Sequence, residues 1–360
     1  MRHDAYDAAA SGRRMERGEL VARFERWFAA KLEVPAVELV DVKSPKGAGT
    51  SSETVLATAR WRADGRDRAR DVVFRVHPDT FQLFMDPDFA LQYKVIDVLH
   101  RDQLVRVPEP LFYEPDPGVI GLPFYVMSQL HGRVPVSSPP YNAAGFLYDA
   151  TPAQRHVAWT TAFEELCQIA KVPISSMPFL GLPERGPTGL AQQLSYWRDS
   201  MAWSCGGEPL DVLVRLADWL EANAPADCTN GFAWGDARMG NMVFGDDLRL
   251  VGVLDWEQAN NAGIRQDLGW WVFFDYFFSA GIGLRRLDGL GTRDETIGMW
   301  ESVVGEPAGD LTWYEVLAGY KVALLAVRTF VLLDSPDARS PEAIPVLGHT
   351  CELAGLPLGV

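Results

Sequence analysis

The chain has 360 residues, of which 48% are hydrophobic and 22% charged. This length exceeds that of a typical single-core domain and predicts two domains or one two-lobed unit. The formal net charge of −15 repels phosphate backbones, which argues against nucleic acid as a partner. Such acidity could weakly attract a cationic substrate, but it also serves solubility in many proteins.

Cysteine usage and the absence of long apolar runs indicate a cytoplasmic location. None of Cys167, Cys205, Cys228 and Cys351 lies in a CxxC pair or near a histidine at metal-ligand spacing, so we expect four reduced thiols. We expect neither a signal peptide nor a membrane span, and hence no membrane partner. Residues 1–12 are polar and Ala-rich and predict a flexible N-terminal tail.

The first third of the chain is predicted to be strand-rich with one central helix. Apolar residues at helical spacing indicate a helix over 14–32, followed by a turn at 46–52 that is rich in Gly, Ser and Thr. The remaining expected elements are a β-hairpin at 53–61 and 72–76, a helix at 90–99 and strands at 110–113 and 123–127. We therefore assign 13–130 to a nucleotide-binding β-lobe (N-lobe) with an extra N-terminal helix.

The pattern changes after residue 130 to long helical stretches interrupted by one strand-rich island at 232–256. A small antiparallel β-lobe before a larger helical lobe is the layout of an α+β, protein-kinase-like fold. We accordingly assign 131–360 to a C-lobe that contains the catalytic loop, the metal site and the substrate-binding helices. The expected helices are 152–171, 190–204, 210–224, 267–279 and 311–333, and a Pro- and aromatic-containing loop is expected at 137–151.

The island carries the residue types that phosphoryl transfer needs. Asp236 and Asn241 are five residues apart, which is the Asp-to-Asn spacing of the kinase catalytic loop. Asp255 follows two short apolar strands, where a metal-binding Asp would be expected. One carboxylate must accept or orient the substrate hydroxyl proton, and an amide oxygen and a second carboxylate must hold Mg²⁺. Either Asp alone would more simply be a turn residue, but the ordered set favours a site.

The sequence from Trp234 to Asn241, Trp-Gly-Asp-Ala-Arg-Met-Gly-Asn, resembles the signature of the aminoglycoside phosphotransferase-like kinases, which also include choline kinases. With Val-Leu-Asp-Trp-Glu at 253–257 and Asp-Leu-Gly-Trp at 267–270, it is most similar to uncharacterised phosphotransferases of mycobacteria and related actinobacteria. It also resembles the kinase domain fused to some acyl-CoA dehydrogenases. The resemblance extends from about residue 44 to residue 328.

The resemblance implies a role for each residue of the island. Asp236 would be the catalytic base, with Arg238 beside it in the catalytic group, and Asn241 and Asp255 would hold Mg²⁺. Asp267 would either brace the catalytic loop or only interact, as a helix N-terminal Asp, with the helix dipole.

Three positions depart from the wider family. Trp234 replaces the usual His before Gly-Asp, which should change loop packing more than chemistry. Arg75 replaces the phosphate-binding Lys, and Gln92 replaces its Glu partner; Gln92 could accept a hydrogen bond from Arg75. We expect Arg75 to point into the interlobe cleft and contact the α/β-phosphates. The alternative is that Arg75 is a solvent-facing strand residue and that Gln92 is a surface helix residue.

Further nucleotide contacts are expected from a loop and a connector. The backbone N–H groups and hydroxyls of Gly49, Thr50, Ser51 and Ser52 could meet phosphates, although such turns are common in hairpins. Met127 and Gln129 lie where the hinge of a kinase would present backbone groups to a purine base. The alternative is that this segment is a plain connector between the lobes. The co-substrate would be ATP or GTP with Mg²⁺.

The acceptor is expected to be a hydroxylated small molecule. Glu315 is the one carboxylate in residues 311–328, which argues mildly against a polycationic aminoglycoside as the acceptor. An apolar hydroxylated metabolite or an acyl-CoA-like hydroxy compound fits the aromatic content of the helical lobe at least as well. The alternative function is a pseudokinase, a nucleotide-binding regulatory module with little turnover, which the changes at Arg75 and Gln92 favour. The aromatic residues considered as pocket lining, each more simply a core residue, are Trp197, Trp203, Trp270, Trp271, Phe274, Tyr276, Phe277 and Trp313.

Overall fold

The computed structural model describes residues 16–44, 53–78 and 81–359. The expected tail at 1–12 and the phosphate-loop residues Gly49, Thr50, Ser51 and Ser52 lie outside these ranges. The chain divides into two compact units. The first comprises the described residues up to Asp97 together with Pro108–Leu130, and the second comprises Val98–Val107 and the described residues from His131 onward.

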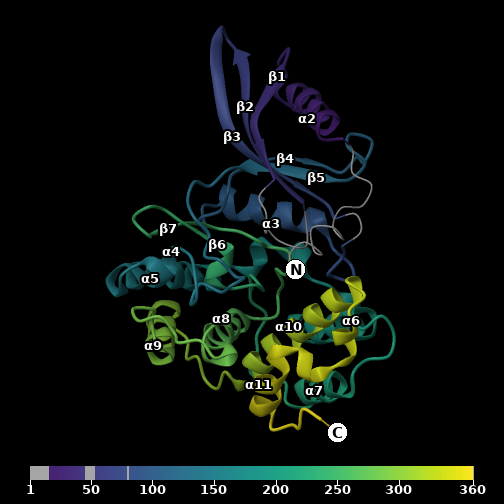
Figure 1. The fold of residues 1–360 in the computed structure, drawn as a ribbon, viewed down its shortest axis with the longest axis vertical. Helices are drawn as coiled ribbons and strands as arrows, with labels where there is room; N and C mark the ends of the chain where they lie inside the picture. The colour runs from purple at the N-terminus through teal and green to yellow at the C-terminus, as the bar shows by residue number, and fades with distance from the viewer. Residues whose placement is uncertain (1–15, 45–52, 79–80, 360) are drawn as a thin grey trace. The chain divides into compact units, whose positions relative to one another are not determined.

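The first unit is built on a five-stranded antiparallel sheet with strand order β1-β2-β3-β5-β4. The long β2–β3 hairpin turns at Asp64 and Gly65, both with positive φ, as the Asp-Gly pair predicts. The elements of this unit are α2 (Arg17–Leu32), β1 (Val37–Lys43), β2 (Glu53–Ala63), β3 (Arg66–Val76), α3 (Phe89–Arg101), β4 (Pro110–Glu114) and β5 (Phe124–Ser128), and Figure 1 shows α2 beside the sheet.

Helix α2 covers one face of this sheet because its apolar residues recur at helical spacing. Phe24 is fully buried and stacks on Phe74 of β3, with ring centroids 4.1 Å apart. The indole N–H of Trp27 donates to the Glu114 carboxylate at 2.6 Å, which satisfies the polar atom of a buried side chain. The apolar face of α2 and the sheet thus form the core of the first unit.

Strand β3 alternates as the sequence predicts. Val72, Phe74 and Val76 belong to the core beneath α2, so Val73 and Arg75 lie on the opposite face. Tyr125, the cross-strand neighbour of Arg75, contacts Phe89 of α3. Arg75 is therefore a partly buried residue on the α3 side of the sheet rather than a residue on a fully solvated face.

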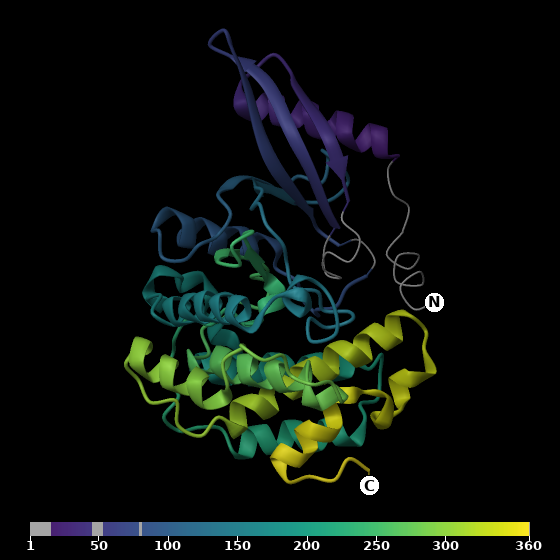
Figure 2. The ribbon, with the colours of Figure 1, turned by 60° about the vertical axis from the view of Figure 1, so that its left-hand side comes forward.

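The second unit is mainly helical and contains the two-stranded antiparallel sheet β6 (Met242–Phe244) and β7 (Leu250–Val253). Helices α8 and α10 pack against each other, as Figures 1 and 2 both show. None of the helices in the described residues combines the length and apolarity that a bilayer span requires. The helices are α4 (Phe146–Asp149), α5 (Pro152–Ala170), α6 (Gly189–Ser204), α7 (Asp211–Ala222), α8 (Arg265–Phe277), α9 (Arg293–Val304), α10 (Thr312–Leu332) and α11 (Pro345–Ala354).

The predicted elements are present within a few residues of their expected bounds, and β1, α9 and α11 are additional, as is the short helix α4 within the expected loop at 137–151. Strand β1 alternates buried Val37 and Leu39 with exposed Glu38, which is the pattern of a half-buried strand. Helix α9 has few apolar residues, but Thr292 and Glu295 form a capping box that marks its start. For these two elements a local signal exists in the sequence.

Candidate active site

The island places its polar residues through two short strands and two backbone contacts. Asn241 ends a 3₁₀ turn, Met239–Asn241, immediately before β6. The backbone N–H of Leu254, just after β7, donates to the carbonyl of Asn241 at 2.9 Å. The β6–β7 hairpin therefore returns the chain so that Asp255 follows directly on a residue bonded to Asn241.

Asp236 is a buried carboxylate that three side chains orient. Its Oδ1 accepts hydrogen bonds from Arg238 Nε at 2.9 Å and from Trp270 Nε1 at 3.0 Å, and its Oδ2 accepts from Asn241 Nδ2 at 2.6 Å. Burial of a carboxylate is costly unless donors of this kind compensate it. The arrangement fixes the rotamer of Asp236 and leaves further acceptor capacity on Oδ2, which accepts only one of these bonds.

Asn241 and Arg238 each face Asp236 with their donor groups. Asn241 Nδ2 also donates to the Asp236 carbonyl at 3.1 Å, so the amide oxygen of Asn241 is turned away from Asp236. Arg238 Nη1 donates to Ser137 Oγ at 3.0 Å, and its guanidinium lies over the Phe274 ring. The attraction of Asp236, Asp255 and Glu257 keeps the pKa of Arg238 above its usual range despite burial. Arg238 is thus a fixed cation beside the carboxylate.

Asp255 adopts a left-handed backbone with φ 65°, an uncommon conformation for a residue with a side chain. The indole N–H of Trp234 donates to the carbonyl of Asp255 at 2.8 Å and to that of Leu254 at 3.1 Å. Trp234, which replaces the usual His, therefore connects the start of the catalytic loop to the segment that carries Asp255. Strained backbone of this kind is concentrated at functional sites.

Asp267 braces the loop that carries Asp236. Its carboxylate accepts the backbone N–H of Trp234 at 2.7 Å and that of Gly235 at 2.8 Å. Gly235 has φ 89°, and a Cβ there would lie 2.2 Å from the carbonyl oxygen of Gln258, so only glycine fits. Of the two roles expected for Asp267, the structure shows the bracing one, although the residue also lies in the first turn of α8.

Two residues near Asp236 were not predicted as part of the site. Trp270, considered only as pocket lining, donates to Asp236 as described above. Lys321 of α10 is fully buried, and its Nζ lies 3.4 Å from the Gly235 carbonyl. The one signal in the sequence that could have pointed to Lys321 is its place inside a long apolar helical run. That signal does not tell which element the lysine faces, because this depends on tertiary packing.

The expected nucleotide-binding residues of the first unit lie on the sheet and on α3. Arg75 Nη1 donates to Thr54 Oγ1 of β2 at 3.0 Å. Gln92 is buried in α3, and its Oε1 accepts a hydrogen bond from the Tyr125 hydroxyl at 3.3 Å. Tyr125 is the neighbour of Arg75 across the β3–β5 pair, so it links α3 to the strand position of Arg75.

The two connector residues follow the same sheet. Met127 is buried in β5 opposite Val73 of β3. The backbone N–H of Gln129 donates to the Asp71 carbonyl at 3.0 Å, which leaves its own carbonyl for other partners.

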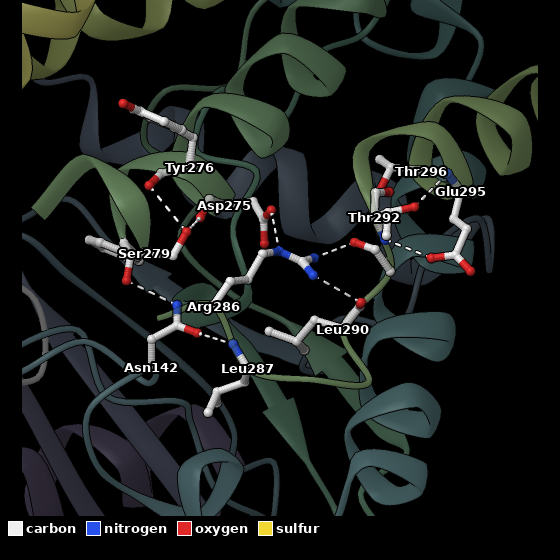
Figure 3. A network of polar contacts seen from close by, with 12 residues as sticks. Asn142, Asp275, Tyr276, Ser279, Arg286, Leu287, Leu290, Thr292, Glu295 and Thr296 are labelled. Atoms are coloured by element: carbon white, nitrogen blue, oxygen red, sulfur yellow. Dashed lines mark hydrogen bonds and ion pairs between the residues drawn. The ribbon is translucent and has the colours of Figure 1, made fainter. Parts of the chain in front are cut away.

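A small pocket lies beside Arg238 within the second unit, and half of its lining residues are aromatic. Asp275 is the one carboxylate in its lining, and Arg286 Nε donates to it at 2.7 Å. Figure 3 shows Arg286 also bonded to the carbonyls of Leu290 and Gly291, and Asn142 bonded to the backbone of Leu287. Of the aromatic residues considered above, Trp271 and Phe274 line the pocket. The lining residues are Tyr141, Trp159, Arg238, Met239, Trp271, Phe274, Asp275 and Leu290.

The comparisons with known proteins agree with this architecture. Among solved structures, the chain superimposes on a candidate aminoglycoside phosphotransferase from Ralstonia eutropha with a TM-score of 0.66 and 22% identity, covering 92% of this chain and 98% of that one. It also matches a thermostable mutant of the aminoglycoside phosphotransferase APH(4)-Ia in complex with ADP and hygromycin B, with a TM-score of 0.57 and 15% identity over 91% and 98% of the two chains. These likenesses define the fold, which is the kinase-like α+β fold predicted from the sequence.

The family follows from the sequence itself. The model of the phosphotransferase enzyme family (APH) matches residues 47–303, and the chain belongs to this family. The curated relatives include acyl-CoA dehydrogenase family member 11 from Gallus gallus, 31% identical over 49% of this chain and 22% of that protein. The Homo sapiens protein of the same name is 29% identical over 64% of this chain and 30% of that protein. The chain thus spans less than a third of the length of these relatives.

We expect Asp267→Asn to loosen the catalytic loop, because an amide can accept from only one of the two backbone N–H groups and presents a donor to the other. The unfolding free energy at pH 7 should fall by about 1–3 kcal/mol in denaturant titrations. Exposed Asp246→Asn is the matched control and should stay within about 0.5 kcal/mol of the parent.

The same variant should alter the pH dependence. Burial raises the pKa of Asp267 to about 6, so the folded state binds this proton more tightly than the unfolded chain. The pH-dependent part of the Asp267 contribution is therefore full at low pH and lost as pH rises from about 4 to 6, while the two backbone hydrogen bonds to its carboxylate remain at pH 7. A parent whose stability follows the same pH curve as Asp267→Asn would contradict this assignment.

Proposed function

We propose that the protein transfers the γ-phosphate of ATP or GTP, with Mg²⁺, to a hydroxyl group of a small molecule, with Asp236 as the base. The observation that supports this most is the fixed, buried Asp236 carboxylate with Arg238, Asn241 and Trp270 as its donors. Phosphoryl transfer requires mainly positioning and charge stabilisation, and this arrangement offers both. With its four free cysteines, the enzyme is proposed to act in the cytoplasm.

Asp236 would accept the proton of the acceptor hydroxyl on an oxygen that retains acceptor capacity. Arg238, held 2.9 Å from Oδ1 of the same carboxylate, would place a positive charge where the equatorial oxygens of the transferred group carry negative charge. Because Ser137 and Asp236 fix the guanidinium from two sides, it needs little reorganisation during the reaction.

The residues present fit a magnesium ion that binds together with a nucleotide. The described residues contain no group of three His, Cys, Asp or Glu that could hold a metal alone. Mg²⁺ commonly uses one or two protein ligands together with substrate phosphates, and the outward amide oxygen of Asn241 and the Asp255 carboxylate supply such a pair. When bound, the ion would neutralise charge on the phosphates.

The lobe formed by residues 13–130, which follows the tail at 1–12, is proposed to bind the nucleotide. The lobe formed by residues 131–360 is proposed to carry the residues for phosphoryl transfer and acceptor binding. Arg75 is proposed to contact the α/β-phosphates, Gly49, Thr50, Ser51 and Ser52 to cover them, and Met127 and Gln129 to face the base. Gln92 would then act in this site indirectly, by positioning Tyr125 beside Arg75.

A pseudokinase remains the second candidate, and one observation favours it. Gln92 carries no charge, so it cannot form the usual ion pair with the phosphate-binding cation, and its Oε1 accepts from the Tyr125 hydroxyl. Retention of Asp236, Asn241 and Asp255 together favours the enzyme, because a module that only binds nucleotide has no need of a base.

The first prediction tests nucleotide binding, which both functions require. Millimolar ATP or GTP with Mg²⁺ should raise the melting temperature of the parent, and Asp255→Ala should remove the metal-dependent part of the shift. Asp247→Ala, at an exposed turn of the same hairpin, should keep it.

Turnover gives the second half of this test. Asp236→Asn should lower slow NTP hydrolysis without acceptor by roughly 100-fold or more. No shift with either nucleotide would exclude the kinase proposal, and an unchanged hydrolysis rate in Asp236→Asn would favour the pseudokinase.

The second prediction concerns Arg75. Arg75→Ala should weaken nucleotide binding by about 1.5–3 kcal/mol in calorimetric titrations, because a charged hydrogen bond to phosphate is lost. Arg75→Lys should restore part of the affinity as a point charge. Arg68→Ala, an exposed arginine of the same strand, is the control and should bind as the parent does. Parent-like affinity in Arg75→Ala would refute the assignment.

The third prediction concerns the acceptor. Half of the residues around the small cavity beside Arg238 are aromatic, and Arg286 neutralises the one carboxylate among them, so this region offers a polycationic aminoglycoside little compensation. Uncharged or anionic hydroxylated compounds with an apolar body should stimulate NTP consumption, with Asp236→Asn as the blank. Stimulation by kanamycin or hygromycin B in preference to such compounds would overturn this prediction.

A further inference from the structure

Lys321 is the only buried Lys or Arg side chain among the described residues, with no exposed surface. It lies in the middle of α10, between apolar residues that include buried Tyr320 and Ala323. An ammonium group moved from water to such surroundings is costly unless polar or charged partners compensate it. A methionine or leucine would fill the same space at lower cost, so the charge calls for a specific explanation.

The contacts of Lys321 converge on the catalytic loop. Its Nζ lies 3.4 Å from the carbonyl oxygen of Gly235, the residue directly before Asp236. The ammonium also lies over two indole rings, 4.6 Å from the centroid of Trp270 and 5.1 Å from that of Trp197. Cation–π contacts of this kind gain strength when they are desolvated. Three elements, α6, α8 and the loop, therefore meet at this one cation.

Trp270 extends the same contact to the carboxylate. The ring whose face meets Lys321 donates its N–H to Asp236 Oδ1 at 3.0 Å. A cation over the face of an indole polarises the ring and makes the N–H a better donor. Lys321 thus acts on Asp236 by two routes, through the Gly235 carbonyl in the backbone and through the Trp270 ring.

Charge and packing are consistent with this arrangement. Burial lowers the pKa of Lys321 to about 8. The negative charges of Asp236 and Asp267 attract the ammonium group and partly oppose this effect of burial. The close approach of α8 and α10 also requires Gly269, because a Cβ there would lie 2.3 Å from Tyr314 Cβ. That approach brings α10 close enough for Lys321 to reach the Trp270 ring and the loop.

We infer that Lys321 and Trp270 are positioning residues that hold the catalytic loop and orient the Asp236 carboxylate for the reaction. This inference rests on the proposed function, since it assumes that Asp236 is the base. Neither residue is assigned any contact with nucleotide or acceptor. Their loss should therefore lower kcat and leave the KM for nucleotide close to that of the parent.

The test uses Mg²⁺-dependent ATP hydrolysis by the full chain. Lys321→Met keeps the volume and removes the charge, and should lower kcat roughly 10- to 100-fold with KM within about twofold. Lys321→Arg should recover part of the loss. Trp270→Phe keeps the ring and removes the N–H, and should lower kcat in the same direction; it also tests the inference if Lys321→Met fails to fold. Val327→Ala, buried on the same helix six residues further on, is the control for stability alone and should retain the parent kcat.

A double-mutant cycle distinguishes positioning from a general structural role. If Lys321 acts through Asp236, adding Lys321→Met to Asp236→Asn should cause almost no further loss of kcat. The inference would be overturned if the losses of kcat were additive, or if the Lys321→Met and Trp270→Phe variants both kept the parent kcat. The proposed function would stand in either case. An Asp236→Asn variant with the parent rate would instead refute the proposed base, and the inference with it.

Discussion

The active loop depends on one constraint: two consecutive backbone N–H groups, those of Trp234 and Gly235, must point at the same carboxylate. Asp267 accepts both, and the chain can turn this way only because residue 235 lacks a side chain. The turn sends Asp236 into the interior and leaves the Trp234 indole free to reach the carbonyls of Leu254 and Asp255. The proposed base and the proposed metal ligand are thus tied to each other through backbone atoms rather than through their side-chain carboxylates.

The charges around this loop are balanced within an apolar setting. Two buried carboxylates, Asp236 and Asp267, are matched by Arg238 on one side and by Lys321 on the other. Large indole rings fill the remaining space and exclude water, so each charge is stabilised by fixed dipoles and hydrogen bonds. Such a site has little need to reorganise when a phosphoryl group arrives, which is the condition that electrostatic catalysis requires.

The sequence predicted those features that depend on local spacing. The Asp236–Asn241 interval, the following hairpin and the alternation in β3 are all encoded over a few residues, and the structure contains each of them. Lys321 lies 85 positions after Asp236, and nothing in its neighbourhood along the chain indicates which element it will face. The same holds for Gln92, because its hydrogen bond with Tyr125 depends on how α3 packs on the sheet. Tertiary packing, which a periodic pattern does not contain, decides both.

The left-handed backbone at Asp255 limits what evolution can place there. Among residues with side chains, asparagine and aspartate adopt this conformation at least cost, because their short polar groups can bond locally. Glutamate would keep the charge but add backbone strain, and glycine would relieve the strain but lose the ligand. Few residues can therefore replace Asp255. Asparagine is the one that keeps the backbone conformation while removing the charge. Homologues that have lost activity by drift should show that exchange first.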